Sequence, residues 1–509
     1  MSGITLIALV VTIVVLLILA GITISLVFSE NGIIAKAREV AEKTNQAVIN
    51  EQAQMNELAD YMENMINEIG GGVVTEEPTL PSDGTYSEEK GVNTPKLESG
   101  MTAIKWNGSA WEETEGSAPD WYDYSAKKWA NAKVEVDGVE SYFVWIPRYA
   151  YKITSGYHQS GAEINSSKPE EGAGTIEIEF LKGTSDEGAT GQTIVEYNSS
   201  TTSNYTQFPN GYVVHPAFVG DASVGGGYGN NNGANDSGIS GIWVAKFEAS
   251  PVGATTDVEN SQYNGTDKKL QVVPGVSSWR GITISNMYDV CKTYNTTLNS
   301  HLMKNSEWGA VAYLSKSKYG KETEEVWINN SSSFITGSAG NSASASTDTG
   351  TTNDYTSTQG VKASTTGNVH GIYDMSGGAW EYVAAYVDNG HENLTKNGLS
   401  LVNGIANTKN VYNNAILTGI AQHDSYIANV EKYGNAIYET SGDSNSPWNL
   451  SWYTDNSAFP NTSDPFFSMG GSYIDTNAAG LFSFGHNYGD GNNDSGTNNV
   501  SFRPVLLVI

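Results

Sequence analysis

The sequence predicts an α+β protein in which a long N-terminal helix precedes a large β-rich domain. No residue from Met1 to Ser29 has a charged side chain, and an apolar repeat of seven residues continues as far as Ile69, as in a long helix. In the rest of the chain Gly, Asn, Ser, Thr and Tyr are abundant and aromatic residues recur at short intervals. That pattern is typical of strands and loops.

The composition restricts the partners and the chemistry. The chain of 509 residues has 27 Lys and Arg against 56 Asp and Glu, a formal charge of −29, which excludes nucleic acid as the expected partner. Only 16% of its residues are charged, which favours an exported protein. Cys291 is the single cysteine, so an intrachain disulfide and a cysteine-based zinc site are excluded.

The N-terminal segment is predicted to enter a membrane. Ile4–Phe28 is almost wholly apolar and long enough to cross a hydrocarbon core of about 30 Å. A continuous helix over Ile4–Ile69 would be on the order of 100 Å long. A secretory signal peptide has its small residue after the apolar region, whereas here Gly3 comes before it. An ordinary single-pass anchor with a short coiled coil is the alternative.

Gly3 followed by Ile4–Thr12 (ITLIALVVT) resembles the cleavage and methylation segment of type IV pilins and pseudopilins. The resemblance implies cleavage between Gly3 and Ile4, a membrane and pilin-like subunits as partners, and a membrane-anchored or pilus-associated protein with an extracellular domain. Ala8 stands where pilins usually have a glutamate that pairs with a neighbouring subunit. Without that buried pair, a place at a tip or in the membrane is favoured over mid-filament packing.

The chain divides into five predicted segments. Residues 1–3 are a leader, 4–69 the membrane and stalk helix, and 70–96 a linker with three glycines and three prolines. Residues 97–133 form an aromatic-rich β segment, and 134–509 form the main domain. Within that domain a strand is expected at Gly241–Glu248, a helix at Ser285–Leu298, and a second helix that begins at Asn305 or Ser306.

Five motifs, taken in order, resemble the formylglycine-generating enzyme family, over roughly Val134 to Ile509. They are GIWVAKFE (241–248), LMKNSEW (302–308), GIYDMSGGAWE (371–381), GGSY (470–473) and SFRPVLL (501–507). The resemblance implies a C-type-lectin-like domain with β-rich insertions. The enzyme requires a pair of cysteines late in this domain, and no cysteine follows Cys291, so we expect the oxidase chemistry to be absent.

Catalytic residues and metal ligands are not predicted. The chain lacks a Gly-x-Ser-x-Gly elbow, a phosphate-binding loop and a His-Glu-x-x-His pair, and its seven histidines are dispersed. The resemblance allows a structural calcium ion near Glu381, but Gly378 stands where the family usually has Asn. Asp490–Ser495 begins like a calcium loop, yet Ser495 and Ser501 replace its Gly and Glu. We therefore expect a turn there and no cofactor.

The segment Tyr473–Val500 is the predicted ligand surface. In its position it resembles the variable region of proteins diversified by retroelements. Every residue in it is Asn or can arise from an Asn codon by mutation of its adenines. An ordinary Asn- and Gly-rich loop is the alternative. Aromatic rings among adaptable polar groups are the mixture that paratopes use. The predicted ligand-binding residues are Tyr473, Asp475, Asn477, Phe482, Phe484, His486, Asn487, Tyr488, Asp490, Asn492, Asn493 and Asp494.

The sequence thus predicts a noncatalytic, surface-displayed ligand-binding protein, a minor pilin or adhesin. Its ligand would be a glycan or a surface protein. Two alternatives stay open: a surface enzyme related to formylglycine-generating enzyme with altered chemistry, and a purely structural pilin subunit.

Overall fold

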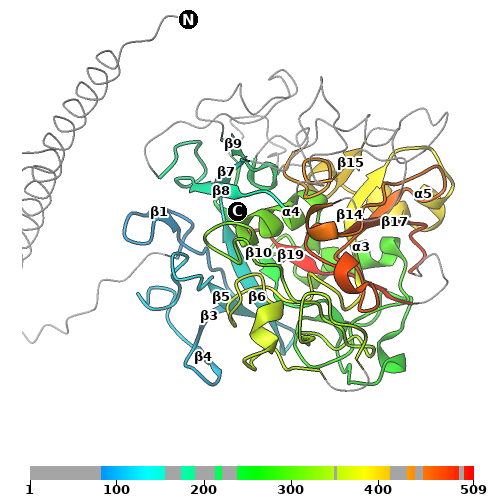
Figure 1. Cartoon of the computed structure of the whole chain (residues 1–509), viewed down its shortest axis with the longest axis horizontal. Coiled ribbons are helices and arrows are strands. Elements are labelled where there is room, and N and C mark those ends of the chain that lie inside the picture. Colours follow the sequence, from blue (N-terminus) through cyan, green and yellow to red (C-terminus); the bar gives the residue numbers. More distant parts are fainter. Residues whose placement is uncertain are drawn as a thin grey trace, which may run out of the picture. The chain divides into compact units, whose positions relative to one another are not determined.

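The computed structural model describes residues 82–154, 173–189, 212–219, 238–348, 352–412, 433–441, 451–491 and 498–508 (Figure 1). The chain divides into two compact units, Met1–Glu77 and Pro78–Ile509. The described residues all belong to the second unit. The predicted leader, the helix over Ile4–Ile69 and the cleavage site at Gly3 and Ile4 lie outside them.

The predicted α+β class with a long membrane or stalk helix is wrong for what the structure describes. The described residues are mostly β structure with four short α-helices, the longest of 11 residues: α3 (Ile284–Tyr294), α4 (Asn305–Ser315), α5 (Asn393–Lys396) and α6 (Leu399–Val402). Within the described ranges, no helix is both long and apolar enough to cross a membrane. Apolar residues come here in short runs separated by Gly, Asn and Ser, so sheets bury them rather than one long helix face.

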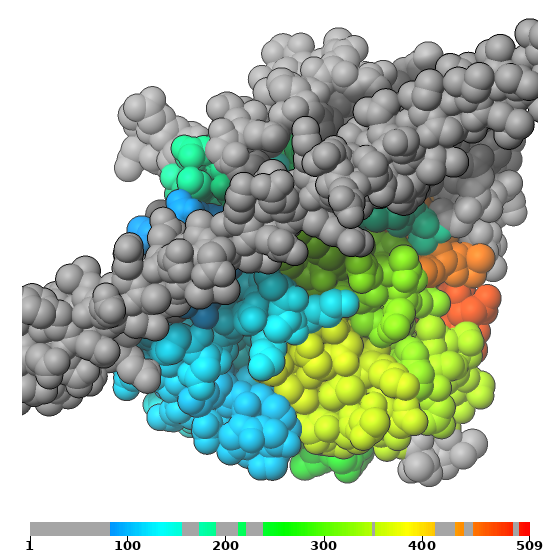
Figure 2. Space-filling view, turned by 60° about the vertical axis from the view of Figure 1, so that its left-hand side comes forward, coloured from blue at the N-terminus to red at the C-terminus, as the bar shows by residue number. Residues whose placement is uncertain are grey.

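The larger sheet has seven strands, and its neighbouring strands run antiparallel. Their order is β13 (His301–Leu302), β19 (Pro504–Leu506), β10 (Gly241–Ala245), β6 (Val139–Pro147), β5 (Asn131–Val136), β3 (Met101–Trp106) and β4 (Trp111–Glu113). The aromatic-rich segment 97–133 therefore shares this sheet with the predicted main domain. Figure 2 shows it, in blue and cyan, packed against later segments in yellow.

The second sheet has five strands. Its path is β15 (Asn410–Tyr412), β14 (Trp380–Val387), β16 (Phe466–Met469) and β17 (Phe484–Asn487), and β18 (Val500–Ser501) pairs with β14 in parallel. Because β18 leads through Phe502 and Arg503 into β19, the last described segment of the chain connects the two sheets.

The remaining elements are short. A third sheet consists of β8 (Ile176–Phe180), β7 (Tyr149–Ile153) and β9 (Val213–Val214), and two pairs are formed by β1 (Tyr86–Ser87) with β2 (Val92–Asn93) and by β11 (Ser250–Pro251) with β12 (Leu270–Gln271). The described ranges also contain six 3-10 turns: η4 (Pro216–Phe218), η5 (Glu259–Ser261), η6 (Gly360–Ala363), η7 (Ala406–Thr408), η8 (Trp452–Thr454) and η9 (Thr476–Ala478).

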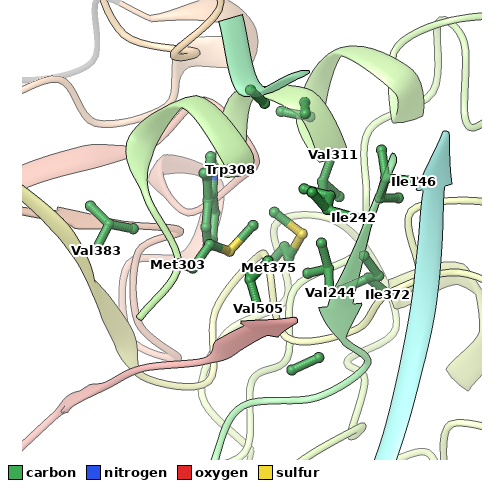
Figure 3. Packing of buried hydrophobic residues seen from close by; sticks show 14 of the residues in the cluster. Ile146, Ile242, Val244, Met303, Trp308, Val311, Ile372, Met375, Val383 and Val505 are labelled. Atoms are coloured by element: carbon green, nitrogen blue, oxygen red, sulfur yellow. The ribbon is translucent and has the colours of Figure 1, made fainter. Parts of the chain in front are cut away.

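Helix α4 lies in the core, and all eleven of its residues are buried. Its first turn is capped by Glu307, whose carboxylate accepts from the Lys304 backbone N–H at 2.7 Å. Figure 3 shows Trp308 and Val311 of this helix beside side chains of β10 and β19. The Trp308 indole N–H also donates to the Leu481 carbonyl at 2.8 Å. The helix thereby ties the large sheet to the segment that precedes β17.

One ion pair is buried where the two sheets meet. The Arg503 guanidinium forms a bidentate ion pair with the Glu381 carboxylate: Nε donates to Oε2 at 2.7 Å, and Nη2 donates to Oε1. Both residues are 0% exposed. The same guanidinium donates to the carbonyls of Ala245 and Tyr373, each at 3.0 Å. Burial raises the pKa of Glu381 to about 7, and Arg503 opposes that rise. Arg503 thus joins β10, β14 and the loop that leads to β14.

We predict that Arg503→Met lowers the free energy of unfolding of the full chain by about 3–5 kcal/mol, because it leaves the Glu381 carboxylate buried without its partner. The loss should shrink as the pH falls, since Glu381 then takes up a proton. Chemical denaturation measures it. The control is Lys105→Met, which breaks an exposed pair with Asp120 and should cost at most about 1 kcal/mol. Equal losses for the two variants would contradict the prediction.

Part of the predicted linker 70–96 is folded into the domain. Residues 86–93 form the β1–β2 pair, and Asn93 is 0% exposed. The Asn93 amide donates to the carbonyls of Gly183 and Ser240, both at 2.9 Å, and accepts from the Gly183 N–H at 2.7 Å. Removing this segment would leave those buried groups without their partner.

We therefore expect a fragment of residues 97–509 to be less stable than one of residues 78–509, by about 2 kcal/mol or more. Thermal and denaturant unfolding of the two fragments, purified in parallel, measure the difference. A fragment of residues 82–509 is the control and should match 78–509. Equal stability of all three would show that β1–β2 contributes nothing.

Candidate functional site

The predicted ligand surface is only partly exposed. Tyr488 is 38% exposed and Asn477 is exposed, while Tyr473, Asp475, His486 and Asp490 are half-buried. Asn492, Asn493 and Asp494 lie outside the described residues. The other three predicted residues, Phe482, Phe484 and Asn487, are buried.

Contacts in the core account for the burial of these three residues. The Phe482 ring packs on Trp452 at 5.0 Å and the Phe484 ring on Phe459 at 4.9 Å, measured between ring centroids. The Asn487 side chain accepts from the hydroxyl of Tyr382. Phe484 and Asn487 are the first and last residues of β17, so their side chains point to opposite faces of the sheet, and both are covered. Phe484 pairs with Met469 across the ladder and therefore faces the core.

His486 belongs to a local polar cluster at the edge strand β17. Its Nδ1 lies 3.2 Å from Oδ2 of Asp464, and the Asn461 amide donates to the same oxygen at 2.6 Å. Burial acts to raise the pKa of Asp464, but the hydrogen bonds from His486 and Asn461 outweigh it and lower the pKa. In β17, His486 pairs with Phe467 of β16, and Gly485 pairs with Ser468. Because His486 and Gly485 are consecutive in the strand, they lie on opposite faces of the sheet.

Trp380 occupies the side on which Gly485 lies. It is the first residue of β14 and is half-buried. A Cβ at Gly485 would lie 3.5 Å from the indole ring, which is an ordinary van der Waals distance, so the indole lies against this part of β17. The backbone N–H of Trp380 donates to the Asn499 carbonyl at 2.9 Å. Trp380 is therefore fixed between β17 and the segment that leads to β18.

Asp475 and Tyr473 flank Trp380. Burial raises the pKa of Asp475, and hydrogen bonds from Ser472 and the Trp380 side chain act against that rise. The Ser472 backbone N–H donates to Oδ2 of Asp475 at 2.6 Å. The backbone N–H of Tyr473 donates to the Gly378 carbonyl at 3.0 Å. Ile474, between Tyr473 and Asp475, is 51% exposed.

The other flank is built on Phe334 and Arg280. The Phe334 ring stands edge-on to Tyr473, with centroids 5.0 Å apart, and the Arg280 guanidinium lies 4.0 Å from its centroid. Phe334 has a φ of 54°, which is strained for an aromatic residue. Arg280 also donates to the Asn498 carbonyl at 2.8 Å. We call the resulting surface the Trp380 face: Trp380, Tyr473, Ile474, Asp475 and Asn498, with the buried Phe334 supporting Tyr473.

The sequence prediction missed Trp380, Phe334 and Asn498. Trp380 was used only as part of a family motif, and Phe334 lies more than 130 positions before Tyr473 in the chain. Asn498 was inside the predicted window but was not chosen. One signal for Trp380 is its position directly before Glu381. Neighbouring residues of a strand face opposite sides, so a buried Glu381 implies that Trp380 points away from the core.

The sequence predicts that Glu381 is a poor calcium ligand, and its carboxylate has another partner in the structure. Its carboxylate is bound by Arg503. At Gly378 (φ +71°) a Cβ would lie 2.6 Å from Oε1 of Glu248, so a larger residue there would require the Glu248 carboxylate to shift. In the part of the chain that the structure describes, no group of three His, Cys, Asp or Glu could hold a metal ion. A structural calcium ion stays a prediction.

No protein-family model matches this chain, and a search of curated proteins finds no match. The resemblances to type IV pilins and to the formylglycine-generating enzyme family therefore stay predictions from their motifs. The Trp380 face can contribute aromatic and aliphatic surface, one carboxyl group and one side-chain amide to a ligand.

Burial predicts opposite results for two residues of the original ligand surface. Phe484→Ala should lower the free energy of unfolding by about 3–5 kcal/mol, since it empties a core site. Tyr488→Ala should change it by about 0.5 kcal/mol, as is usual at exposed positions. Urea denaturation of the two full-length variants tests this. A small effect of Phe484→Ala would mean that β17 does not pack as described.

Proposed function

We propose that the chain is a noncatalytic ligand-binding protein, a minor pilin or an adhesin, that binds outside the cell through the Trp380 face. The observation that carries the proposal is the exposed Ile474 next to the half-buried rings of Tyr473 and Trp380, on segments held by hydrogen bonds. The pilin-like segment at Gly3 and Ile4 supports display outside the cell.

The arrangement favours binding because its groups are already ordered. Ser472 fixes the Asp475 carboxylate, and Gly378 holds the backbone of Tyr473. A ligand would then not need to order these groups, which is an entropic cost that flexible surfaces incur. Rigid rings beside short polar side chains are also the composition of paratopes. A glycan or a loop of a surface protein fits such a face.

Diversification by a retroelement is part of the proposal. Ile474, Asn477 and Tyr488 are exposed positions within Tyr473–Val500, so changes there would alter the surface with little effect on the core. Trp380 and Phe334 lie outside that segment and would stay constant. A near-identical copy of the coding segment beside a reverse transcriptase gene would support this part.

The enzyme alternative has no observation in its favour. Cys291, the single cysteine of the chain, is 0% exposed in α3, and burial raises the pKa of its thiol. A buried protonated thiol is a poor nucleophile and a poor metal ligand. An oxidation assay on a cysteine-containing peptide tests this alternative, and we expect no turnover.

The test of function is a binding screen of the full chain against glycans and surface proteins, followed by variants. We expect Tyr473→Ala with Ile474→Ser to weaken binding of the selected ligand at least tenfold, because both residues belong to the Trp380 face and Ile474 is its most exposed residue. The matched control is Leu399→Ser, since Leu399 is 48% exposed on α6, and it should bind normally. Unchanged affinity of the double variant would overturn the proposed site.

A further inference from the structure

The chain has one aspartyl-prolyl peptide bond, and that bond lies at the polar cluster around His486. Of the 14 prolines, Pro465 is the one that follows an aspartate, Asp464. Both residues are buried, and Pro465 directly precedes β16. The amide nitrogen of proline has no N–H and is more basic than that of an ordinary peptide bond. A peptide bond to proline therefore breaks more readily once its nitrogen accepts a proton.

The Asp464 carboxylate is held through one of its oxygens. Oδ2 lies 3.2 Å from Nδ1 of His486 and accepts from the Asn461 amide at 2.6 Å. Oδ1 is buried and, among the described residues, makes no hydrogen bond. A structural buried aspartate differs: at Asp374 both oxygens accept from the Gly337 N–H, at 2.8 and 3.0 Å. Oδ1 of Asp464 is thus a carboxylate oxygen that is available to react.

The carbonyl groups on both sides of the bond are fixed. The Asn461 backbone N–H donates to the Asp464 carbonyl oxygen at 3.3 Å, and the Val387 N–H donates to the Pro465 carbonyl at 2.8 Å. The first contact stabilises negative charge on the oxygen of the carbonyl that is attacked. An aspartate side chain is one methylene group from its own Cα, so attack by Oδ1 closes a five-membered ring and is intramolecular.

The charge of Asp464 agrees with this geometry. Burial acts to raise the pKa of Asp464, yet the hydrogen bonds from His486 and Asn461 keep it below its ordinary value, so the carboxylate is ionised at neutral pH. His486 is the titratable side chain in contact with it, and an imidazolium group can supply a proton to a leaving nitrogen.

Asp455 provides a contrast within the same chain. It also has a buried carboxylate oxygen that makes no hydrogen bond to the described residues. Burial, however, raises the pKa of Asp455 well above its ordinary value, so its carboxyl group is a weaker nucleophile. The residue that follows it is Asn456, not a proline. We therefore expect no reaction at Asp455.

We propose that the chain cleaves itself once, between Asp464 and Pro465. Oδ1 attacks the Asp464 carbonyl carbon, the bond from that carbon to the Pro465 nitrogen breaks, and the nitrogen takes a proton from the His486 imidazolium. The products are a cyclic anhydride at Asp464 and an amine at Pro465. One water molecule then opens the anhydride to two carboxylates, and the two protons released go to the imidazole and the amine. The sum is hydrolysis of one peptide bond.

The two pieces are expected to stay together in the folded protein. In the C-terminal piece, β16 and β18 pair with β14, and β19 pairs with β10 and β13. The cut removes one covalent link and leaves these pairings in place. Self-cleavage and ligand binding at the Trp380 face can therefore be measured separately.

The test incubates the purified full chain at neutral pH with protease inhibitors and follows its fragments by mass spectrometry under denaturing conditions. We expect a fragment of residues 465–509 to form at a rate independent of protein concentration, and at least about tenfold faster in the folded chain than in concentrated urea at the same pH. Asp464→Asn and His486→Gln should each slow the cut at least about tenfold. The control Asp137→Asn, at an exposed aspartate, should leave the rate unchanged.

Equal rates in the folded and the urea-unfolded chain would overturn the proposal, because they would reflect only the ordinary lability of an aspartyl-prolyl bond. A chain that stays intact, or a cut that neither Asp464→Asn nor His486→Gln slows, would overturn it as well. If either variant does not fold, the comparison of the folded and unfolded forms of the unchanged chain decides.

Discussion

The buried pair of Arg503 and Glu381 is the constraint on which the rest of the domain depends. Two charges cannot stay away from water unless each is matched closely. Arg503 meets this requirement with the Glu381 carboxylate and two backbone carbonyls. Because Ala245 lies on β10, and Tyr373 and Glu381 lie in one stretch that leads into β14, satisfying one guanidinium joins the segments at residues 245, 373–381 and 503, which are far apart in the sequence.

The position of Trp380 follows from that pair. Glu381 must point inward to reach Arg503, so Trp380, the preceding residue of the same strand, points to the opposite face. Glu248 adds a second restraint, because its carboxylate accepts from the Ala379 N–H at 2.9 Å. The ligand surface that we propose is therefore a consequence of how buried carboxyl groups are satisfied beneath it.

Sequence patterns predicted the strands and helices better than the burial of residues in the predicted ligand surface. The expected strand at Gly241–Glu248 and the helices at Ser285 and Asn305 are confirmed by β10, α3 and α4, because each has a local signal of apolar residues or caps. The burial of Phe484 could not be predicted in the same way. It depends on the pairing of β17 with β16, and β17 is a four-residue strand among Gly and Asn residues that typify loops.

The same limit applies to the candidate site. Tyr473 and Asp475 were predicted from composition, but their neighbours Phe334 and Arg280 come from distant segments, and no local pattern indicates such contacts. The α+β prediction with a long helix is wrong for the described residues, because it rests on the apolar pattern of residues 4–69, which lies outside them. The described residues bury their apolar side chains through strands and short helices.

The central claim is that buried hydrogen bonds hold the Trp380 face rigid before any ligand binds. Hydrogen exchange of the free, full-length chain tests it most directly, at the backbone amides of Gly378, Ala379, Trp380 and Tyr473, which all donate hydrogen bonds. The account predicts that these amides exchange as slowly as those of β10 in the centre of the large sheet, through global unfolding. Exchange at these four amides on the timescale of exposed loops, while β10 remains protected, would contradict it.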